Sequence, residues 1–145
     1  PYELLAGVVA AIDMLADLVP GDESTLTQRE RLVRSMGALE VYEEVLRVRL
    51  REGLAAIDGI RLYGNARHKT PTELFSLEGV TSTDVYHRLA DDKVNAPAGS
   101  FYAIEAAQWL GLPTDGAVRA GISPYTNTDD VDRLVACVAG IAKAR

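Results

Sequence analysis

Residues 116–134, GAVRAGISPYTNTDDVDRL, decide how this chain is expected to fold. Apolar side chains alternate at positions 118, 120 and 122, which predicts a β-strand with Arg119 and Gly121 on its opposite face. A turn follows, and Asn127 with Asp130 three residues later has the spacing of a helix capping box. A strand that leads directly into a capped helix would hold Arg119 on rigid structure, and we expect its side chain to be buried.

The pattern alone allows two interpretations of Arg119. A fixed guanidinium can bind a carboxylate through two parallel hydrogen bonds, a geometry that lysine cannot reproduce. The same side chain can form a structural salt bridge with a neighbouring Asp or Glu, which is common for arginines on regular structure. The spacing of the residues leaves both interpretations open.

Two long amphipathic helices are expected at the start of the chain. Apolar residues recur with helical spacing over residues 4–18, and Pro-Gly-Asp at 20–22 would end the first helix. Ser24 or Thr25 would open the second helix. Its apolar stripe is expected to face a core: Leu32, Met36, Leu39, Tyr42, Val45, Leu46 and Leu50. Its charged face is predicted to be solvated and without function: Arg29, Glu30, Arg34, Glu43, Glu44, Arg47 and Arg51.

The rest of the chain predicts short strands separated by helices and loops. Besides the Arg119 strand, strands are expected at residues 60–64, 73–77 and 94–96. Helices are expected after a cap at Thr81 or Ser82, at residues 102–110 and at residues 131–142. This order favours the α+β class, with helices packed on one face of a small, mainly antiparallel sheet that the long amphipathic helices precede.

The composition predicts one globular domain over residues 1–145. Of these residues 48% are hydrophobic and 25% are charged, which is enough to build one core. The net charge of −6 is spread along the chain without a basic run, which argues against nucleic acid as a partner. The sequence shows no apolar run of membrane-spanning length, no export signal and a single cysteine, so we expect a cytoplasmic protein.

The stretch at 116–134 resembles the end of the class V aminotransferase family, the fold-type I pyridoxal phosphate enzymes that include cysteine desulfurases. The resemblance rests on Arg119 followed by two small residues, on Tyr125 and on the run DDVDRL at 129–134. Residues 1–15 resemble the helix after the family's Gly-Thr loop, and IRLYG at 60–64 resembles its first small-domain strand. The resemblance covers nearly the whole chain. It implies that residues 1–19 form a helix connecting to a large domain absent from this sequence.

The resemblance also implies a division of labour. Pyridoxal 5'-phosphate and its Schiff-base lysine would belong to the absent domain of a homodimeric enzyme, while Arg119 would bind the α-carboxylate of an amino-acid substrate. None of Lys69, Lys93 and Lys143 has the hydrophobic surround that lowers an amine pKa. All three are therefore predicted to be solvated, and the chain alone is predicted to be inactive.

The segment NAPAGSFYA at 95–103 is the second candidate site. In the cysteine desulfurases that it resembles, a strand runs through an arginine and a glycine to a nucleophilic cysteine, and the aligned positions here are Pro97, Gly99 and Tyr102. A phenol, with an ordinary pKa of about 10, cannot replace an attacking thiolate, so desulfurase chemistry is not expected. Gly99 would let a ligand approach the backbone, and Tyr102 would either line the substrate site or face the core. Together with Arg119, these two form the predicted substrate-binding set.

The other residues with reactive side chains are expected to be structural. Cys137 and Trp109 should pack, the first in an apolar helix and the second against the sheet. His68 and His87 lack the paired spacing of a metal site and should lie at the surface. A second function stays open at this point, a non-catalytic α+β domain that binds a partner or a small carboxylate.

Overall fold

A computed structural model describes residues 1–21 and 25–145, which form two compact units. The first unit is Pro1–Glu43 and the second is Glu44–Arg145, with the boundary inside the long helix α2 (Gln28–Ala55). Among the helices of the described residues, none combines the length and the apolar character that a bilayer crossing needs. The assignment of the whole chain to one domain stays a prediction.

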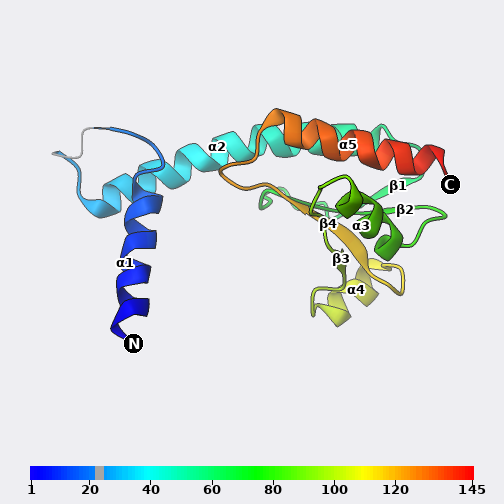
Figure 1. Cartoon of the computed structure of the whole chain (residues 1–145), viewed down its shortest axis with the longest axis horizontal. Helices are drawn as coiled ribbons and strands as arrows, with labels where there is room; N and C mark the ends of the chain where they lie inside the picture. Colours follow the sequence, from blue (N-terminus) through cyan, green and yellow to red (C-terminus); the bar gives the residue numbers. More distant parts are fainter. Residues whose placement is uncertain (22–24) are drawn as a thin grey trace. The chain divides into compact units, whose positions relative to one another are not determined.

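The first unit consists of helix α1 (Tyr2–Ala16) and the beginning of α2 (Figure 1). The Ser35 hydroxyl joins them, because it donates to the carbonyl of Ala16 at 2.8 Å and accepts from the amide of Val19 at 3.2 Å. Helix α1 ends before Pro20, and Asp22 lies outside the described residues. The helix is confirmed, although several of its leucines and valines are more than half exposed.

Thr27 caps α2, in place of the predicted Ser24 or Thr25. Its hydroxyl accepts from the amide of Glu30 at 3.3 Å, and the Glu30 carboxylate accepts from the amide of Thr27 at 2.8 Å. This reciprocal pair is a capping box, which satisfies two amides at the helix start. Thr25 lies outside that box, and Ser24 lies outside the described residues.

The apolar stripe of α2 is confirmed only in part. Leu46 and Leu50 are buried, but Met36, Tyr42 and Val45 are exposed. The helix is 28 residues long, and its buried leucines lie in the half that packs on the sheet of the second unit. Helical periodicity alone does not say how much of a long helix the core covers.

The second unit is built on an antiparallel sheet with the strand order β1-β2-β4-β3 (Figure 1). The strands are β1 (Ile60–Tyr63), β2 (Thr72–Leu77), β3 (Ala98–Gly99) and β4 (Ala117–Gly121). The helices beside α2 are α3 (Ser82–Asp91), α4 (Ile104–Leu110) and α5 (Thr128–Lys143). This arrangement confirms the α+β class and the antiparallel sheet.

One face of the sheet carries the core. Helices α3, α5 and the end of α2 pack on this face, and Phe75 of β2 stands opposite Val118 of β4, both fully buried. Burying a side chain of this size stabilises a fold by about 1.5–3 kcal/mol relative to leaving it exposed. Because side chains alternate along a strand, every second residue of β2 and β4 points to the opposite face, which we call the open face.

The helix starts of the second unit follow the sequence, but one predicted strand is wrong. The Thr81 hydroxyl accepts from the amide of Asp84 at 3.0 Å at the start of α3, and Asn127 with Asp130 forms the predicted capping box of α5. Residues 94–96 do not form the predicted strand. The sheet is extended at β3 instead, because the register with β4 pairs Ala98 and Gly99 with Val118 and Ala117.

A buried ion network corrects the prediction that the charged face of α2 is solvated. Glu73 of β2 is fully buried, and its carboxylate accepts one hydrogen bond from Arg47 and one from Arg51, each at 2.7 Å. The Lys69 amine lies 3.7 Å from the same carboxylate and donates to a backbone carbonyl, so Lys69 is not a solvated residue. Hydrogen bonding to Glu44, and then to Glu73, raises the pKa of Arg47 above its ordinary value.

Candidate functional site

Arg119 projects from the open face of the sheet. Val118 and Ala120 are buried whereas Arg119 and Gly121 are exposed, which confirms the predicted alternation and contradicts the expected burial of Arg119. Strand β4 lies between β2 and β3, and the Arg119 amide also donates to the carbonyl of Pro97 at 2.9 Å. Arg119 therefore lies on an inner strand, and its side chain is exposed to solvent.

The Arg119 guanidinium is not part of a salt bridge within residues 1–21 and 25–145. Arg47 and Arg51, in contrast, each bond the Glu73 carboxylate. The structural salt bridge that the sequence left open is thus not formed in this part of the chain. An exposed planar guanidinium of this kind can receive a carboxylate from a ligand through two hydrogen bonds.

The ring of Phe101 lies against the Arg119 guanidinium. The Arg119 Cζ atom is 4.1 Å from the centroid of the ring, well within the range of a cation–π contact. An exposed contact of this type stabilises by about 0.5–1 kcal/mol. The ring takes up one side of the guanidinium and uses none of its N–H donors for a conventional hydrogen bond.

Phe101 and Tyr102 occupy the centre of a tight turn over residues 100–103. The amide of Ala103 donates to the carbonyl of Ser100 at 3.0 Å, and the φ angles of Phe101 and Tyr102 are 52° and 63°. Two successive positive φ angles are typical of a type I′ turn, which favours Asn-Gly. Bulky residues in this region cost on the order of 1–3 kcal/mol each, more than one ring contact returns. The surrounding structure must therefore impose this turn.

Gly99 and Gly116 lie at the two ends of the connection from β3 to the strand that carries Arg119, and their backbones approach closely. Gly116 has a φ of 82°, and a Cβ atom at this position would collide with the backbone carbonyl of Gly99. The group that approaches Gly99 closely is therefore the backbone of Gly116, where the sequence suggested a ligand. At this corner of the sheet, Arg119 lies on β4, Gly99 on the neighbouring strand β3 and Tyr102 in the turn that follows β3, and their use as one binding set stays a prediction.

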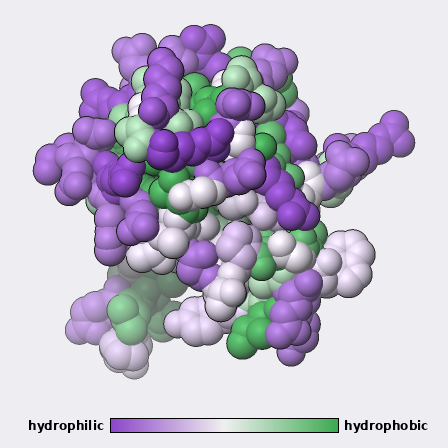
Figure 2. Space-filling model, turned by 90° about the vertical axis from the view of Figure 1, so that its right-hand side faces the viewer, coloured by the Kyte–Doolittle hydropathy of each residue, from purple (hydrophilic) through white to green (hydrophobic). Residues whose placement is uncertain are grey.

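The predicted packing of Trp109 against the sheet is wrong, and the core-facing alternative for Tyr102 is excluded. Tyr102 is fully exposed and Trp109 is 86% exposed, so neither faces the core or packs against the sheet. Helix α4, which carries Trp109, has no buried residue and lies on the side of β3 and β4 away from α5 (Figure 1). The face drawn in Figure 2 is mainly hydrophilic, with smaller hydrophobic areas between the polar residues. Of the two alternatives for Tyr102, the core-facing one is excluded, and lining of the substrate site stays a prediction.

The remaining candidates form neither a nucleophile site nor a metal site. Cys137 packs on the core, and burial, followed by its hydrogen bond with Asp92, raises the pKa of its thiol. His68 and His87 are exposed, as predicted. The described residues contain no cluster of three or more His, Cys, Asp or Glu side chains that could hold a metal ion.

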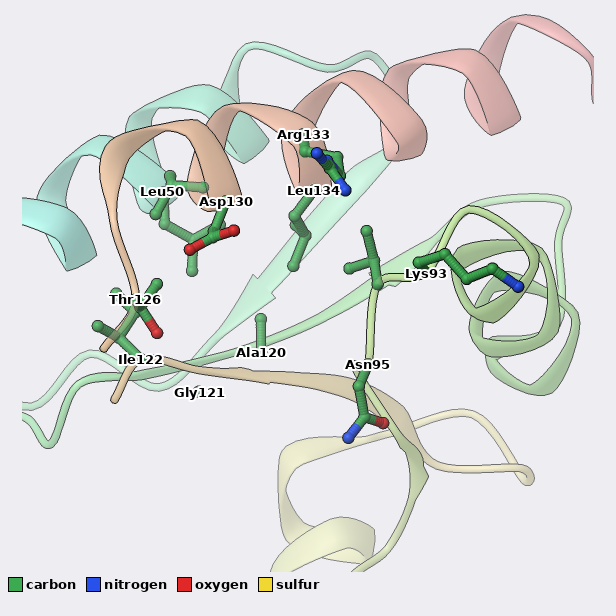
Figure 3. A pocket seen from close by; sticks show the side chains of 12 residues that line it. Leu50, Lys93, Asn95, Ala120, Gly121, Ile122, Thr126, Asp130, Arg133 and Leu134 are labelled. Atoms are coloured by element: carbon green, nitrogen blue, oxygen red, sulfur yellow. The ribbon is translucent and has the colours of Figure 1, made fainter. Parts of the chain in front are cut away.

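A small cavity of about 190 Å³ lies on the helix-covered face (Figure 3). It is formed between the end of β4, the start of α5 and the connection from α3 to β3, and Leu50, Ile122 and Leu134 supply apolar walls. Arg119 does not line this cavity, and Asp130 at its rim already accepts from the amide of Asn127. The cavity is separate from the corner that holds Arg119.

Comparison with known proteins identifies the family. The sequence pattern of class-V aminotransferases matches residues 31–134 of this chain. The chain belongs to the aminotransferase class-V family. The uncharacterized protein MT3887 of Mycobacterium tuberculosis is 33% identical over 142 residues, which cover 97% of this chain and 34% of that protein. A probable cysteine desulfurase of Pseudomonas putida is 32% identical over 97 residues, which cover 67% of this chain and 23% of that protein.

Solved cysteine desulfurase structures share this fold. The desulfurase CsdA of Escherichia coli matches 73% of this chain and 25% of its own, with a TM-score of 0.65 and 27% identity. The apo enzyme of Thermococcus onnurineus matches 81% of this chain and 29% of its own, with a TM-score of 0.73 and 23% identity. The chain of this class-V protein therefore spans 23–34% of the length of these relatives.

Phe101 is the neighbour of Arg119 that sequence reasoning missed. The available signal was the aromatic pair Phe101-Tyr102, which follows Gly99 after one intervening residue. The turn that brings Phe101 under Arg119 has no glycine at its two central positions. Turn rules that look for Asn or Gly therefore do not find it.

Proposed function

We propose that this chain acts as the carboxyl-terminal domain of a larger class-V enzyme that works on an amino acid, and that Arg119 binds the α-carboxylate of that substrate. The observation that carries the proposal is an exposed guanidinium on an inner strand, without a carboxylate partner among the described residues. Family membership supports an amino acid as the substrate class.

Arg119 would contribute positioning more than bond making. Two parallel N–H donors hold a carboxylate in one plane, and a fixed carboxylate restricts how the rest of the substrate can rotate. Hydrogen bonds to a charged group contribute about 1.5–3 kcal/mol each. The location on an inner strand favours this role, because the antiparallel ladder and the Pro97 carbonyl restrain the backbone of Arg119.

The family depends on pyridoxal phosphate, but the described residues of this chain do not fit a site for it. The Lys69 amine is already bonded to a carbonyl and lies beside Glu73. Lys93 and Lys143 are exposed, just beyond α3 and at the end of α5. We therefore assign no step of the cofactor's chemistry to this chain and propose that the cofactor is held outside these residues.

The proposed reaction is not sulfur transfer through a thiolate on the loop of residues 99–103. By the resemblance to the desulfurases, Tyr102 takes the place of their cysteine; Tyr102 is fully exposed. Cys137 is the free cysteine of the described chain, and it packs on the core face of the sheet, opposite to the face that carries Arg119. Amino-group transfer and elimination of another group both remain compatible with a carboxylate-binding arginine.

Substitution of Arg119 in the full-length protein tests the proposal. Arg119→Lys keeps the charge but loses the planar fork, so amino-acid affinity should fall by roughly 1.5–3 kcal/mol, and Arg119→Ala should lose more. Cofactor absorbance and thermal midpoint should stay near wild type, because Arg119 lies outside the core.

Arg61→Ala is the matched control for this experiment. Arg61 is also exposed on the open face, and its Cζ lies 5.0 Å from the Tyr63 ring, but it is on the outer strand β1. Its removal should leave amino-acid titration unchanged. An unchanged titration with Arg119→Ala would eliminate the carboxylate-binding role, and a full-length protein that binds amino acids without any cofactor would favour a non-catalytic binding domain.

A further inference from the structure

We infer that Phe101 is a positioning residue, whose ring holds the Arg119 guanidinium in the orientation that receives a carboxylate. The inference rests on the proposed function of Arg119 and assigns a role to its nearest aromatic neighbour. It comes from one contact and one backbone feature, the 4.1 Å stacking distance and the turn with two positive φ angles.

An arginine that binds a ligand must be held without using the donors that the ligand needs. Arg47 is held by carboxylates, and those bonds occupy its N–H groups. An aromatic ring instead attracts the face of the cation through its quadrupole. The in-plane N–H donors of Arg119 then stay available for a carboxylate. A ring contact therefore gives order to a long flexible side chain without blocking its binding edge.

The backbone around Phe101 supports a role beyond filling space. Both central residues of the turn adopt left-handed conformations that Asn or Gly would adopt at lower cost. Tyr63, which stacks with Arg61, shows that a sheet can supply such a ring from a regular strand without a positive φ. At residue 101 the ring lies in an unfavourable turn, and local departures from folding rules of this kind concentrate at functional sites.

The test compares binding of two probes to the full-length protein. L-Alanine carries an α-carboxylate, and L-alaninamide carries a neutral amide in its place. The dissociation constant of L-alaninamide divided by that of L-alanine, called the ratio below, therefore reports recognition of the carboxylate. A substitution that only weakens the fold does not change this ratio. The thermal midpoint of each variant is measured on the same samples.

Four variants separate the ring from the turn. Phe101→Leu keeps apolar bulk and should reduce the ratio roughly five- to tenfold, whereas Phe101→Tyr keeps the ring and should preserve it. Phe101→Asn places a turn-favouring residue at this position, so it should raise the thermal midpoint and still reduce the ratio. Lys93→Gly relieves a positive φ of 63° outside this turn and keeps the Phe101 ring, so the ratio should stay at the wild-type value.

Arg119→Ala distinguishes the failure of this inference from the failure of the proposed function. The positioning role is supported if the ratio falls in Arg119→Ala, Phe101→Leu and Phe101→Asn and is preserved in Phe101→Tyr. If the ratio falls in Arg119→Ala but is unchanged in folded Phe101→Leu and Phe101→Asn, the role of Phe101 is overturned and Arg119 is still the residue that binds the carboxylate. An unchanged ratio in Arg119→Ala overturns both.

Discussion

Glu73→Ala should be among the most damaging single substitutions in this chain. The Glu73 carboxylate is fully buried, and it bonds Arg47 and Arg51 while Lys69 lies nearby. Its removal leaves Arg47, whose side chain is only 11% exposed, without its buried partner. Breaking a buried ion pair from one side costs about 3–5 kcal/mol. For a chain of this length, that loss lowers the thermal midpoint by roughly 10–16 °C.

The assay is thermal and urea denaturation of the 145-residue protein, followed by circular dichroism. Asp132→Asn is the control, because Asp132 accepts two hydrogen bonds from Arg49, at 2.7 and 2.8 Å, in a pair that is about half exposed. Exposed pairs contribute little, so this midpoint should hardly move. The thermal midpoint of Glu73→Gln should lie between those of Glu73→Ala and Asp132→Asn, because glutamine keeps the volume of the side chain and loses its charge. Equal midpoints for Glu73→Ala and Asp132→Asn would refute the reasoning from burial.

Three further predictions concern the rest of the chain. Burial and the hydrogen bond with Asp92 raise the pKa of the Cys137 thiol, so at pH 8 a smaller fraction of it is thiolate than in a free cysteine. Iodoacetamide should therefore alkylate Cys137 slowly at pH 8, and faster as the pH rises past the ordinary thiol pKa. Cys137→Ala should cost only about 1 kcal/mol of stability and leave turnover of the full-length enzyme unchanged, whereas abolished turnover would show a missed nucleophile. The 145-residue chain, dialysed after incubation with pyridoxal phosphate, should keep no cofactor absorbance, and a borohydride-trapped adduct on Lys69, Lys93 or Lys143 would contradict the assignment of the cofactor to other residues.

Local patterns in the sequence predicted the parts of the fold that local interactions decide. The alternation around Arg119 and the capping box at Asn127 and Asp130 depend on residues within a few positions, and both are present. Thr27 and Glu30 have the same three-residue spacing and also form a capping box, although the start of this helix was predicted at Ser24 or Thr25. These elements follow from spacing because the interactions that form them are short in sequence.

Features that depend on distant residues were not predictable from spacing. The burial of Glu73 depends on arginines 22 and 26 positions away along the chain, so its partners could not be distinguished from other surface charges. The contact of Phe101 with Arg119 depends on a turn whose residues contradict the usual preferences. Arg119 itself was identified by its strand, but its exposure depends on which elements cover the second face of the sheet, and spacing does not show this.

The contact between Gly99 and Gly116 has a consequence for how this protein can diversify. It brings the two ends of the connection over residues 100–115 together. Helix α4 therefore lies in a loop whose two ends are held next to each other. Closing a flexible loop becomes only about 0.6 kcal/mol less favourable for each doubling of its length. Insertions or deletions within α4 would therefore change what surrounds the open face while the register of β4, and with it the place of Arg119, stays the same. The architecture separates a fixed anchor from a region that is free to vary in length.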